Sequence, residues 1–253
     1  MNNTILEIIR LKKTFGGVIA VNDLDLTVAK ESITAVIGPN GAGKTTIFNL
    51  TAGFLAPTSG SLIFDNQDIS GKKSYEIARL GISRTFQHVQ IFPEMTVLEN
   101  IMIGRHVRSR AGLFVSSLLP YFLRKEESKI QEDAEKYLEF VGLQPVSGKH
   151  AGELSLGNQR MVEIARALAS EPKLLLLDEP ASGLNARETL LLGDLINKIK
   201  DTRITVMLVE HDMELVMDIS DHVAVINFGQ LIATGTPSSV QENQDVISAY
   251  LGE

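Results

Sequence analysis

Three short runs of apolar residues predict the strands of a buried sheet. They are Ile33–Ile37, Leu174–Leu177 and Thr205–Val209, and none of them contains a charged residue. Strands that are covered on both faces, as in a parallel sheet, have this continuous apolar pattern. We therefore expect an α/β fold whose core is a mostly parallel sheet.

Alternating apolar and polar residues near both ends of the chain predict antiparallel strands. Leu6–Leu11 and Leu24–Val28 alternate in this way. The pattern is typical of strands with one face in water, and it predicts an N-terminal antiparallel β layer. Near the C-terminus, Val223–Ile226 and Gln230–Thr234 flank Phe228-Gly229 and predict a hairpin.

Helical spacing of apolar residues predicts a helix over Glu126–Val141, and Gly142 suits the end of this helix. The remaining predicted elements are two strands, Ser61–Phe64 and Ser83–Gln87, and five helices, Lys44–Ala52, Ser74–Leu80, Arg160–Ala169, Ser238–Asn243 and Asp245–Leu251.

The pattern is less regular between residues 104 and 126. A basic cluster at positions 105–110 precedes the apolar stretch Leu113–Leu123, which contains Pro120. This stretch is shorter than the ~20 residues that a membrane-spanning helix needs. Packing on a helical subdomain, contact with a partner and a position on a membrane surface all fit this composition.

Composition excludes several classes of protein. The 253 residues carry a net charge of −7 and include no cysteine. A nucleic-acid-binding protein usually has an excess of Lys and Arg, so we expect no nucleic-acid partner. Disulfides and thiolate metal sites are excluded, which fits a cytosolic location. The N-terminus lacks the basic-then-apolar pattern of a signal peptide, so we expect a protein that is soluble by itself.

A glycine-rich segment between the first apolar run and a predicted helix has the pattern Gly-x4-Gly-Lys-Thr. It reads Gly38, Pro39, Asn40, Gly41, Ala42, Gly43, Lys44, Thr45 and Thr46. In such a loop the backbone N–H groups converge on the phosphates of a nucleotide, and the helix N-terminus adds a positive dipole end. Lys44 would reach the β- and γ-phosphates and Thr45 would ligate Mg²⁺. The alternative, a glycine-rich turn with no ligand, is disfavoured by the strand–loop–helix context.

Two carboxylates follow the leucine run directly. Asp178 and Glu179 come at the C-terminal end of a predicted buried strand, where open α/β sheets bind their ligands. In a P-loop protein, an Asp at this position holds Mg²⁺ through the water shell of the ion. His211 follows another buried strand, so it would lie on the same sheet edge if the two strands are parallel.

These motifs, in this order, resemble the nucleotide-binding subunits of ATP-binding-cassette (ABC) transporters over essentially the whole chain. Leu154–Gln159 is similar to the family signature Leu-Ser-Gly-Gly-Gln, but Leu156 and Asn158 depart from it. The segment Ser83–Gln87 with Ile91–Asn100 resembles the Gln-loop region. The loop ending at Asn185 resembles the one that follows the catalytic Glu, although the family usually has Asp at this position.

Within this family the chain most resembles the larger ATPase of branched-chain amino acid importers. The likeness rests on Ile101–His106, the insertion through Leu123, Val209–Met213 and Ala249–Glu253. The resemblance implies a single nucleotide-binding domain. Its ATPase core would be 1–87 and 172–253, and its helical subdomain about 88–171.

The resemblance also assigns roles to individual residues. Pattern alone favours a core position for Phe15, whereas the family implies that it stacks on adenine. The family further implies that the backbone from Gly41 to Thr46 and Lys44 hold the phosphates of ATP. In the family, Mg²⁺ would be ligated directly by Thr45 and Gln87 and through water by Asp178. The implied catalytic residues are Glu179 as general base, His211 as a contact to the γ-phosphate, and Lys44 and Gln87.

In this family the signature segment acts on nucleotide bound by another subunit. Ser155 and Gly157 would therefore contact the γ-phosphate in a second ATP-binding subunit, either a copy of this chain or a related one. The implied complex also contains transmembrane permease subunits and, indirectly, a periplasmic or extracellular binding protein. It would place this chain on the cytoplasmic face of the cell membrane.

Two other functions remain open at this point. The chain could be an ABC ATPase of an export, lipid-transport or non-transport system, or a non-catalytic module built on a degenerate cassette. The intact Lys44, Asp178, Glu179 and His211 argue against the last of these. The cargo itself would be chosen by the membrane and periplasmic subunits.

Overall fold

The computed structural model describes residues 3–105 and 120–251. These residues form two compact units, one comprising 1–87 with 173–253 and the other 88–172. Most of the predicted basic cluster and of the apolar stretch before Pro120 lies outside the described residues. Among the described helices, none combines the length and the apolar character needed to cross a bilayer.

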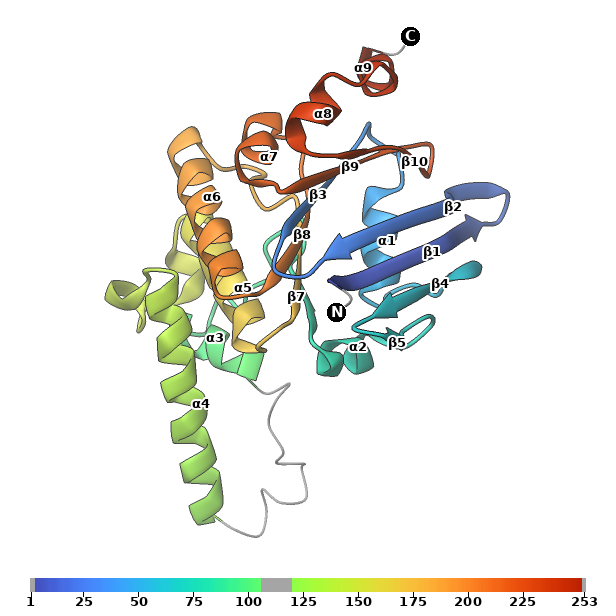
Figure 1. The fold of residues 1–253 in the computed structure, drawn as a ribbon. Coiled ribbons are helices and arrows are strands. Elements are labelled where there is room, and N and C mark those ends of the chain that lie inside the picture. Colours follow the sequence, from blue (N-terminus) through green and yellow to red (C-terminus); the bar gives the residue numbers. More distant parts are fainter. Residues whose placement is uncertain (1–2, 106–119, 252–253) are drawn as a thin grey trace. The chain divides into compact units, whose positions relative to one another are not determined.

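The larger unit contains a six-stranded sheet in the order β10-β9-β3-β8-β7-β6 (Figure 1). All its strands are parallel except the edge strand β10, which pairs antiparallel with β9. The strands are β3 (Ile33–Ile37), β6 (Ile82–Arg84), β7 (Leu174–Asp178), β8 (Thr205–Val209), β9 (His222–Asn227) and β10 (Gln230–Gly235). Every residue of β3, β7 and β8 is buried, which confirms the mostly parallel sheet predicted from the apolar runs.

A second, antiparallel sheet has the order β2-β1-β4-β5 and confirms the predicted β layer. Its strands are β1 (Thr4–Phe15), β2 (Val18–Ala29), β4 (Ser59–Phe64) and β5 (Gln67–Asp68). The first two are longer than the alternating pattern predicted. Their pairing has register shifts, including one between Ile8 and Leu11, which interrupt the two-residue period without ending the strand.

The two sheets and the helix after the glycine-rich loop share one core. Leu6 and Leu11 of the antiparallel sheet, Val36 and Leu176 of the parallel sheet and Phe48 of this helix belong to one cluster of buried apolar side chains. The helices of this unit are α1 (Lys44–Thr51), α2 (Ser74–Leu80), α6 (Ala186–Asp201), α7 (Met213–Ile219), α8 (Pro237–Gln241) and α9 (Gln244–Leu251). This core fixes the glycine-rich loop between β3 and α1.

The smaller unit is helical and has its own core. It contains α3 (Val97–Arg105), α4 (Pro120–Phe140) and α5 (Leu156–Ala169), with two short 3-10 turns at Gln144–Val146 and Ala151–Glu153. Arg105 at the end of α3 pairs with Asp133 of α4 at 2.8 Å and with Glu171 at 2.8 Å. Apolar side chains of all three helices belong to one buried cluster.

Outside β1 and β2, three predicted boundaries differ from the structure by more than two residues. Helix α4 begins at Pro120 rather than at Glu126, because proline is tolerated at the first position of a helix, where its missing N–H costs nothing. Helix α5 begins at Leu156 rather than at Arg160, because the Ser155 side chain caps it. Strand β6 ends at Arg84, so the following residues through Gln87 are not part of it.

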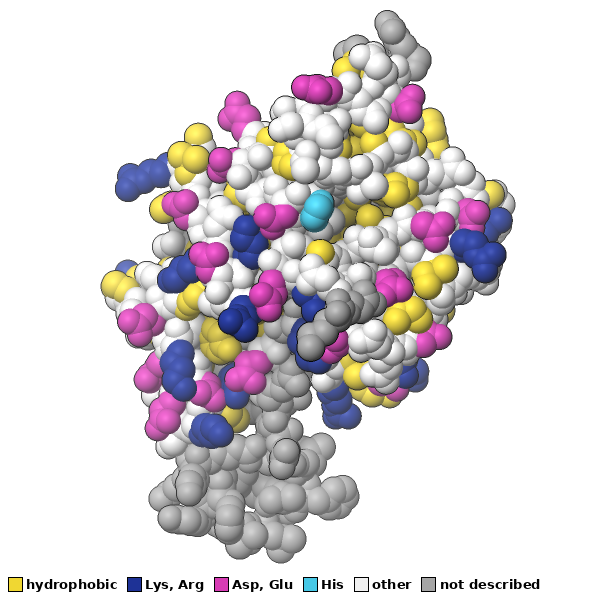
Figure 2. Space-filling view, viewed as in Figure 1, with side chains coloured by type: hydrophobic (Ala, Val, Ile, Leu, Met, Phe, Trp, Pro, Cys, Tyr) yellow, Lys and Arg dark blue, Asp and Glu magenta, His cyan; other side chains and the backbone are white. Residues whose placement is uncertain are grey.

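Acidic and basic side chains are interspersed over the face of the described residues shown in Figure 2. Apolar side chains are visible between them, as on most protein surfaces in water.

Candidate nucleotide-binding site

The glycine-rich loop connects β3 to α1 and requires glycine at two of its positions. Gly38 has φ 150° and Gly43 has φ 104°, both in the region that favours glycine. A Cβ atom on Gly38 would collide with the carbonyl oxygen of Ile226, and one on Gly43 with that of Ala20. The backbone of the loop is therefore packed too closely for any side chain at these positions.

Lys44, the first residue of α1, is held against its own loop. Its Nζ donates hydrogen bonds to the carbonyl oxygens of Gly38 at 2.7 Å and Pro39 at 3.0 Å. An ammonium group has three N–H donors, so one remains for a ligand. Burial lowers the pKa of Lys44 from its ordinary value of 10.5, and the charges of Glu179 and Asp178 oppose this shift. The charges of both carboxylates at the C-terminal end of β7 thus act on Lys44.

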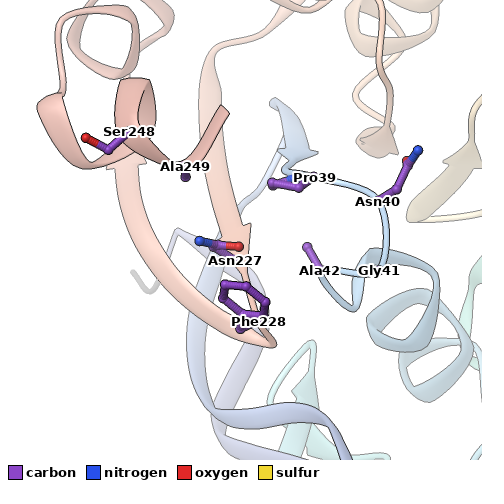
Figure 3. A pocket seen from close by; sticks show the side chains of 8 residues that line it. All are labelled: Pro39, Asn40, Gly41, Ala42, Asn227, Phe228, Ser248 and Ala249. Carbon is purple, nitrogen blue, oxygen red and sulfur yellow. The ribbon is translucent and has the colours of Figure 1, made fainter. Parts of the chain in front are cut away.

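A pocket of about 310 Å³ lies along the side of the loop (Figure 3). Its lining comes from three segments far apart in the sequence: Pro39, Asn40, Gly41 and Ala42 of the loop, Asn227 at the end of β9 with Phe228 of the following turn, and Ser248 and Ala249 of α9. The neighbouring residue of α9, Tyr250, has its pKa raised by burial, against a hydrogen bond from the backbone of Gly38. Nothing in the sequence indicated that the C-terminal helix lies beside this loop.

The strands that carry the predicted catalytic residues are parallel neighbours. Asp178 at the end of β7 is in register with Val209 at the end of β8. The residues that follow the two strands therefore meet at one sheet edge, which confirms the position predicted for His211. His211 Nε2 lies 2.9 Å from Oε1 of Glu179, and Gln87 Nε2 donates to Oε2 of Glu179 at 2.8 Å.

Glu179 is held in an unusual backbone conformation. Its φ is 47°, in the left-handed region, which costs a residue other than glycine about 1–3 kcal/mol. Two hydrogen bonds maintain it: the N–H of Glu179 donates to Val209 O at 2.9 Å, and the N–H of Ser182 donates to Glu179 O at 3.1 Å. The surrounding loop thus fixes the direction of this carboxylate.

Glu210 is a buried residue of the site that sequence reasoning missed. Its Oε1 accepts from the N–H of Ala181 at 2.6 Å and its Oε2 from the N–H of His211 at 2.9 Å. Burial raises the pKa of Glu210, and these backbone hydrogen bonds oppose the rise. Glu210 therefore ties the loop after Glu179 to the backbone of His211. A charged residue directly after a buried strand was the available signal.

Arg84 is a second residue that sequence reasoning missed. Its Nη2 lies 2.7 Å from Oδ2 of Asp178, and both side chains are about 95% buried, with 5% and 4% of their surface exposed. Its Nη1 donates to Oδ1 of Asn49 on α1 at 2.6 Å. The guanidinium also lies within 6 Å of the ring centroids of Phe48, Phe54 and Phe86. An arginine within a strand pattern was the available signal.

Comparison with known proteins identifies the family. A family model described as "ABC transporter" matches residues 21–182, and one described as "Branched-chain amino acid ATP-binding cassette transporter" matches residues 230–253. The chain belongs to the ABC transporter ATP-binding family. The family resemblance predicted from the sequence is confirmed.

Two curated relatives align with this cassette along its full length. The high-affinity branched-chain amino acid transport ATP-binding protein LivG of Escherichia coli strain K12 is 44% identical over 254 residues, with 100% of each chain covered. The corresponding protein BraF of Pseudomonas aeruginosa is 46% identical over 258 residues, again with 100% of each chain covered. A solved structure, the ADP conformation of an ATP-binding cassette of an ABC transporter, is 36% identical and covers 99% of both chains with a TM-score of 0.86. The predicted fold class is confirmed.

Phe15 of this cassette is not a core residue. It is the last residue of β1, pairs with Val18 across the hairpin and is 46% exposed. The Lys13 ammonium lies 5.1 Å from the centroid of its ring. The core position favoured by the pattern was therefore wrong, and a ring exposed to this extent can take a planar ligand on its face.

The signature residues Ser155 and Gly157 belong to the helical unit of the cassette. Ser155 caps α5 and its hydroxyl oxygen accepts from the N–H of Asn158 at 3.4 Å. Gly157 is buried in the first turn, whereas Leu156, which departs from the family pattern, is 43% exposed. The larger side chain of Leu156 therefore points away from the packing of α5.

Asn185, another departure from the family pattern, has a clear local role. Its Oδ1 accepts from the N–H of Glu188 at 3.1 Å, and the Glu188 carboxylate accepts from the N–H of Asn185 at 3.1 Å. This reciprocal pair is a capping box at the start of α6. Asparagine caps a helix as well as aspartate does, so the substitution preserves the end of the loop.

The residues predicted to hold Mg²⁺ fit this ion by their chemistry. Thr45, Gln87 and Asp178 supply hydroxyl, amide and carboxylate oxygens, the hard donors that Mg²⁺ prefers. Among the described residues there is no group of three or more His, Cys, Asp or Glu side chains suited to a metal. A sparse set of this kind suits an ion whose coordination is completed by water and substrate phosphates.

Proposed function

We propose that this cassette is the ATP-hydrolysing subunit of an importer for branched-chain amino acids. The hydrolytic part of the proposal is carried by one observation, the hydrogen-bonded set Gln87–Glu179–His211 beside the phosphate loop. In this set both carboxylate oxygens of Glu179 form hydrogen bonds, at the edge of the sheet where the phosphate loop also begins. The charges of Glu179 and Asp178 both act on Lys44.

Binding of ATP would use the loop and the exposed aromatic ring. The backbone N–H groups from Gly41 to Thr46 and the third N–H of Lys44 would take the phosphates, since they supply positive charge without a bulky side chain. Phe15 would stack on the adenine. A stacked ring binds the base without requiring a specific hydrogen-bond pattern.

Hydrolysis would use Glu179 to orient and deprotonate the attacking water. A carboxylate is a weak base in isolation, and its usefulness here would come from its position beside the water in a closed site. The water oxygen bonds to the γ-phosphorus, the bond from that phosphorus to the bridging oxygen breaks, and ADP leaves. His211 would contact the γ-phosphate while its hydrogen bond holds Glu179.

The Mg²⁺ ion would be held by Thr45 and Gln87 directly and by Asp178 through water. When bound, it neutralises charge on the β- and γ-phosphate oxygens. The Gln87 amide can take this role through its oxygen while its nitrogen stays bonded to Glu179.

Hydrolysis would be coupled to transport through a second cassette. Ser155 and Gly157, at the N-terminus of α5, would contact the γ-phosphate held by the partner cassette, so that ATP joins the two subunits. Loss of these contacts on hydrolysis is the difference in binding free energy that can shift a conformational equilibrium. The partner would be a copy of this chain or a related one.

The cargo and the location follow from the relatives. LivG and BraF are branched-chain amino acid transport ATP-binding proteins, and the C-terminal segment of this chain matches a model for that subgroup. The cassette would therefore act on the cytoplasmic face of the cell membrane. There it would bind permease subunits, which a periplasmic or extracellular binding protein supplies with substrate.

Mixing two inactive variants tests the shared site. Ser155→Ala and Lys44→Ala should each lose ATPase activity, and a mixture should regain part of it because one of the two composite sites is then intact. No recovery in a mixture that still associates would contradict a site shared between subunits.

Uptake measurements test the cargo. Cells in which the chromosomal gene for this cassette carries Glu179→Gln should lose uptake of radiolabelled leucine, isoleucine and valine. Uptake of arginine, the control, should be retained. Loss of ATPase activity with unchanged leucine uptake would contradict the assigned cargo, and leave the ATPase assignment intact.

A further inference from the structure

Arg84 is the one buried cation in direct contact with a residue of the predicted magnesium site, within the part of the chain that the structure describes. It forms an ion pair with Asp178, which is 3% exposed. Its second nitrogen bonds to Asn49 of α1, the helix that begins at Lys44. Arg84 thus connects β6, β7 and the phosphate-loop helix.

The arginine is held rigidly by its surroundings. Three phenylalanine rings surround the guanidinium, with centroids 5.9, 5.6 and 5.1 Å from its central carbon. Rings at such distances stabilise a planar cation and limit its movement. The direction in which Arg84 presents its Nη2 to Asp178 is therefore fixed before any ligand binds.

Packing alone does not account for an arginine at this position. Its Nε atom is buried and has no hydrogen-bond partner, which is costly for a charged group. An apolar side chain among three aromatic rings would avoid both this cost and the desolvation of the ion pair. The arginine is therefore explained better by what it does to Asp178 than by the stability that it adds.

Two consequences for Asp178 follow from this contact. Only Oδ2 of Asp178 accepts a hydrogen bond from the described residues, so Oδ1 remains as an acceptor of fixed orientation. The positive charge of Arg84 also balances the negative charge of Asp178. Because the charges of Asp178 and Glu179 both act on Lys44, these two carboxylates are balanced by two cations, Lys44 and Arg84.

We propose that Arg84 is a positioning residue of the ATPase site that orients Asp178 and balances its charge, so that the phosphate loop accepts ATP before Mg²⁺ is added. The inference rests on the proposed function. Without the arginine, the uncompensated carboxylate would repel the phosphates and attract the metal ion. ATP binding would then depend more strongly on Mg²⁺.

Two substitutions separate the charge of Arg84 from its geometry. Arg84→Met removes both, whereas Arg84→Lys keeps the charge but has a single nitrogen, which cannot reproduce the fork that holds Asn49 and Asp178 together. Arg79→Met is the matched control, because Arg79 is an exposed arginine on α2 of the same unit.

The main measurement is the affinity for a non-hydrolysable ATP analogue, adenylyl imidodiphosphate, by calorimetry in chelator and in excess Mg²⁺. The dissociation constant in chelator, divided by that in excess Mg²⁺, should increase about tenfold in Arg84→Met, mainly because the analogue binds more weakly in chelator. It should stay within about twofold of wild type in Arg84→Lys and Arg79→Met. A role limited to packing would leave this ratio unchanged.

The turnover number supplies the second measurement. We expect kcat to fall about tenfold in Arg84→Lys at saturating Mg²⁺, because Asp178 loses its fixed orientation. A folded Arg84→Met with an unchanged ratio, or an Arg84→Lys with wild-type kcat, overturns the proposal. Wild-type kcat in Arg84→Lys overturns the proposal even if Arg84→Met does not fold. A wild-type chain that neither binds the analogue nor hydrolyses ATP would instead refute the proposed function itself.

Discussion

His211 and Glu179 are joined by a hydrogen bond of 2.9 Å between Nε2 and Oε1, although they follow different strands of the sheet. The parallel pairing of β7 with β8 brings them together. Glu179 has 16% of its side chain exposed and His211 has 44%, so both remain accessible to a ligand. The bond therefore restricts the orientation of the Glu179 carboxylate.

Replacing His211 should impair turnover more than binding. We expect His211→Ala to lower kcat about 10²–10³-fold, because Glu179 loses one of its two side-chain partners, and to change ATP affinity only slightly. A steady-state ATPase assay with calorimetry checks this. His222→Ala is the control, since His222 is exposed at the start of β9. Equal losses in both variants would contradict the role of His211.

Lys44 should make nucleotide affinity sensitive to alkaline pH. Burial lowers the pKa of its ammonium from 10.5, so the charge is lost at a lower pH than in an exposed lysine. ATP affinity should therefore decline as the pH rises toward the lowered pKa of Lys44. Lys44→Ala should abolish measurable ATP binding. Lys129→Ala, an exposed position on α4, serves as the control. Undiminished ATP affinity in Lys44→Ala would refute the assigned role of the loop.

Glu210 should contribute to the pH dependence of stability. Burial raises its pKa above the ordinary 4.5, so the folded chain binds this proton more tightly than the unfolded chain does. The stabilisation from that proton is complete below pH 4.5 and is lost as the pH rises through the folded-state pKa.

A comparison with Glu210→Gln isolates this effect. The free energy of unfolding of wild type relative to Glu210→Gln should decline with rising pH over this window, as measured by urea denaturation at several pH values. A difference that is constant across the window, or that grows with pH, would show that Glu210 does not titrate as its burial implies.

Gly43 should tolerate no side chain. We expect Gly43→Ala to lose ATP binding and to lower the free energy of unfolding by about 1–3 kcal/mol, because φ is 104° and the new Cβ would collide with the Ala20 carbonyl. Gly148→Ala is the control, since a Cβ there meets no atom within 4 Å. Thermal unfolding and calorimetry measure both effects, and wild-type values in Gly43→Ala would contradict this packing.

The elements that the sequence predicted best are those whose signal is local. The bounds predicted for Ile33–Ile37, Thr205–Val209 and Ser74–Leu80 agree with β3, β8 and α2. The ends of an unbroken apolar run, or of a short helix flanked by glycine, can be predicted from the neighbouring residues alone. The starts of α4 and α5 were missed because Pro120 and the signature segment are compatible with both helix and loop.

The contacts inside the site were harder to predict because they depend on which strands are neighbours. Nothing near Arg84 in the sequence indicates that β6 lies beside β7, and only this pairing brings its guanidinium to Asp178. Glu210 likewise has its partner Ala181 on a loop 29 residues away. The sequence supplied the chemical groups, and the order of strands in the sheet decided their partners.

The most direct test of the account is ATP turnover by Glu179→Gln, compared with Glu242→Gln, an exposed control after α8. The substitution keeps the size of the side chain and removes its ability to take a proton. We predict a turnover about 10²–10⁴-fold below wild type with ATP affinity retained, and an unchanged control. Wild-type turnover in Glu179→Gln would contradict the central claim that this carboxylate activates the water.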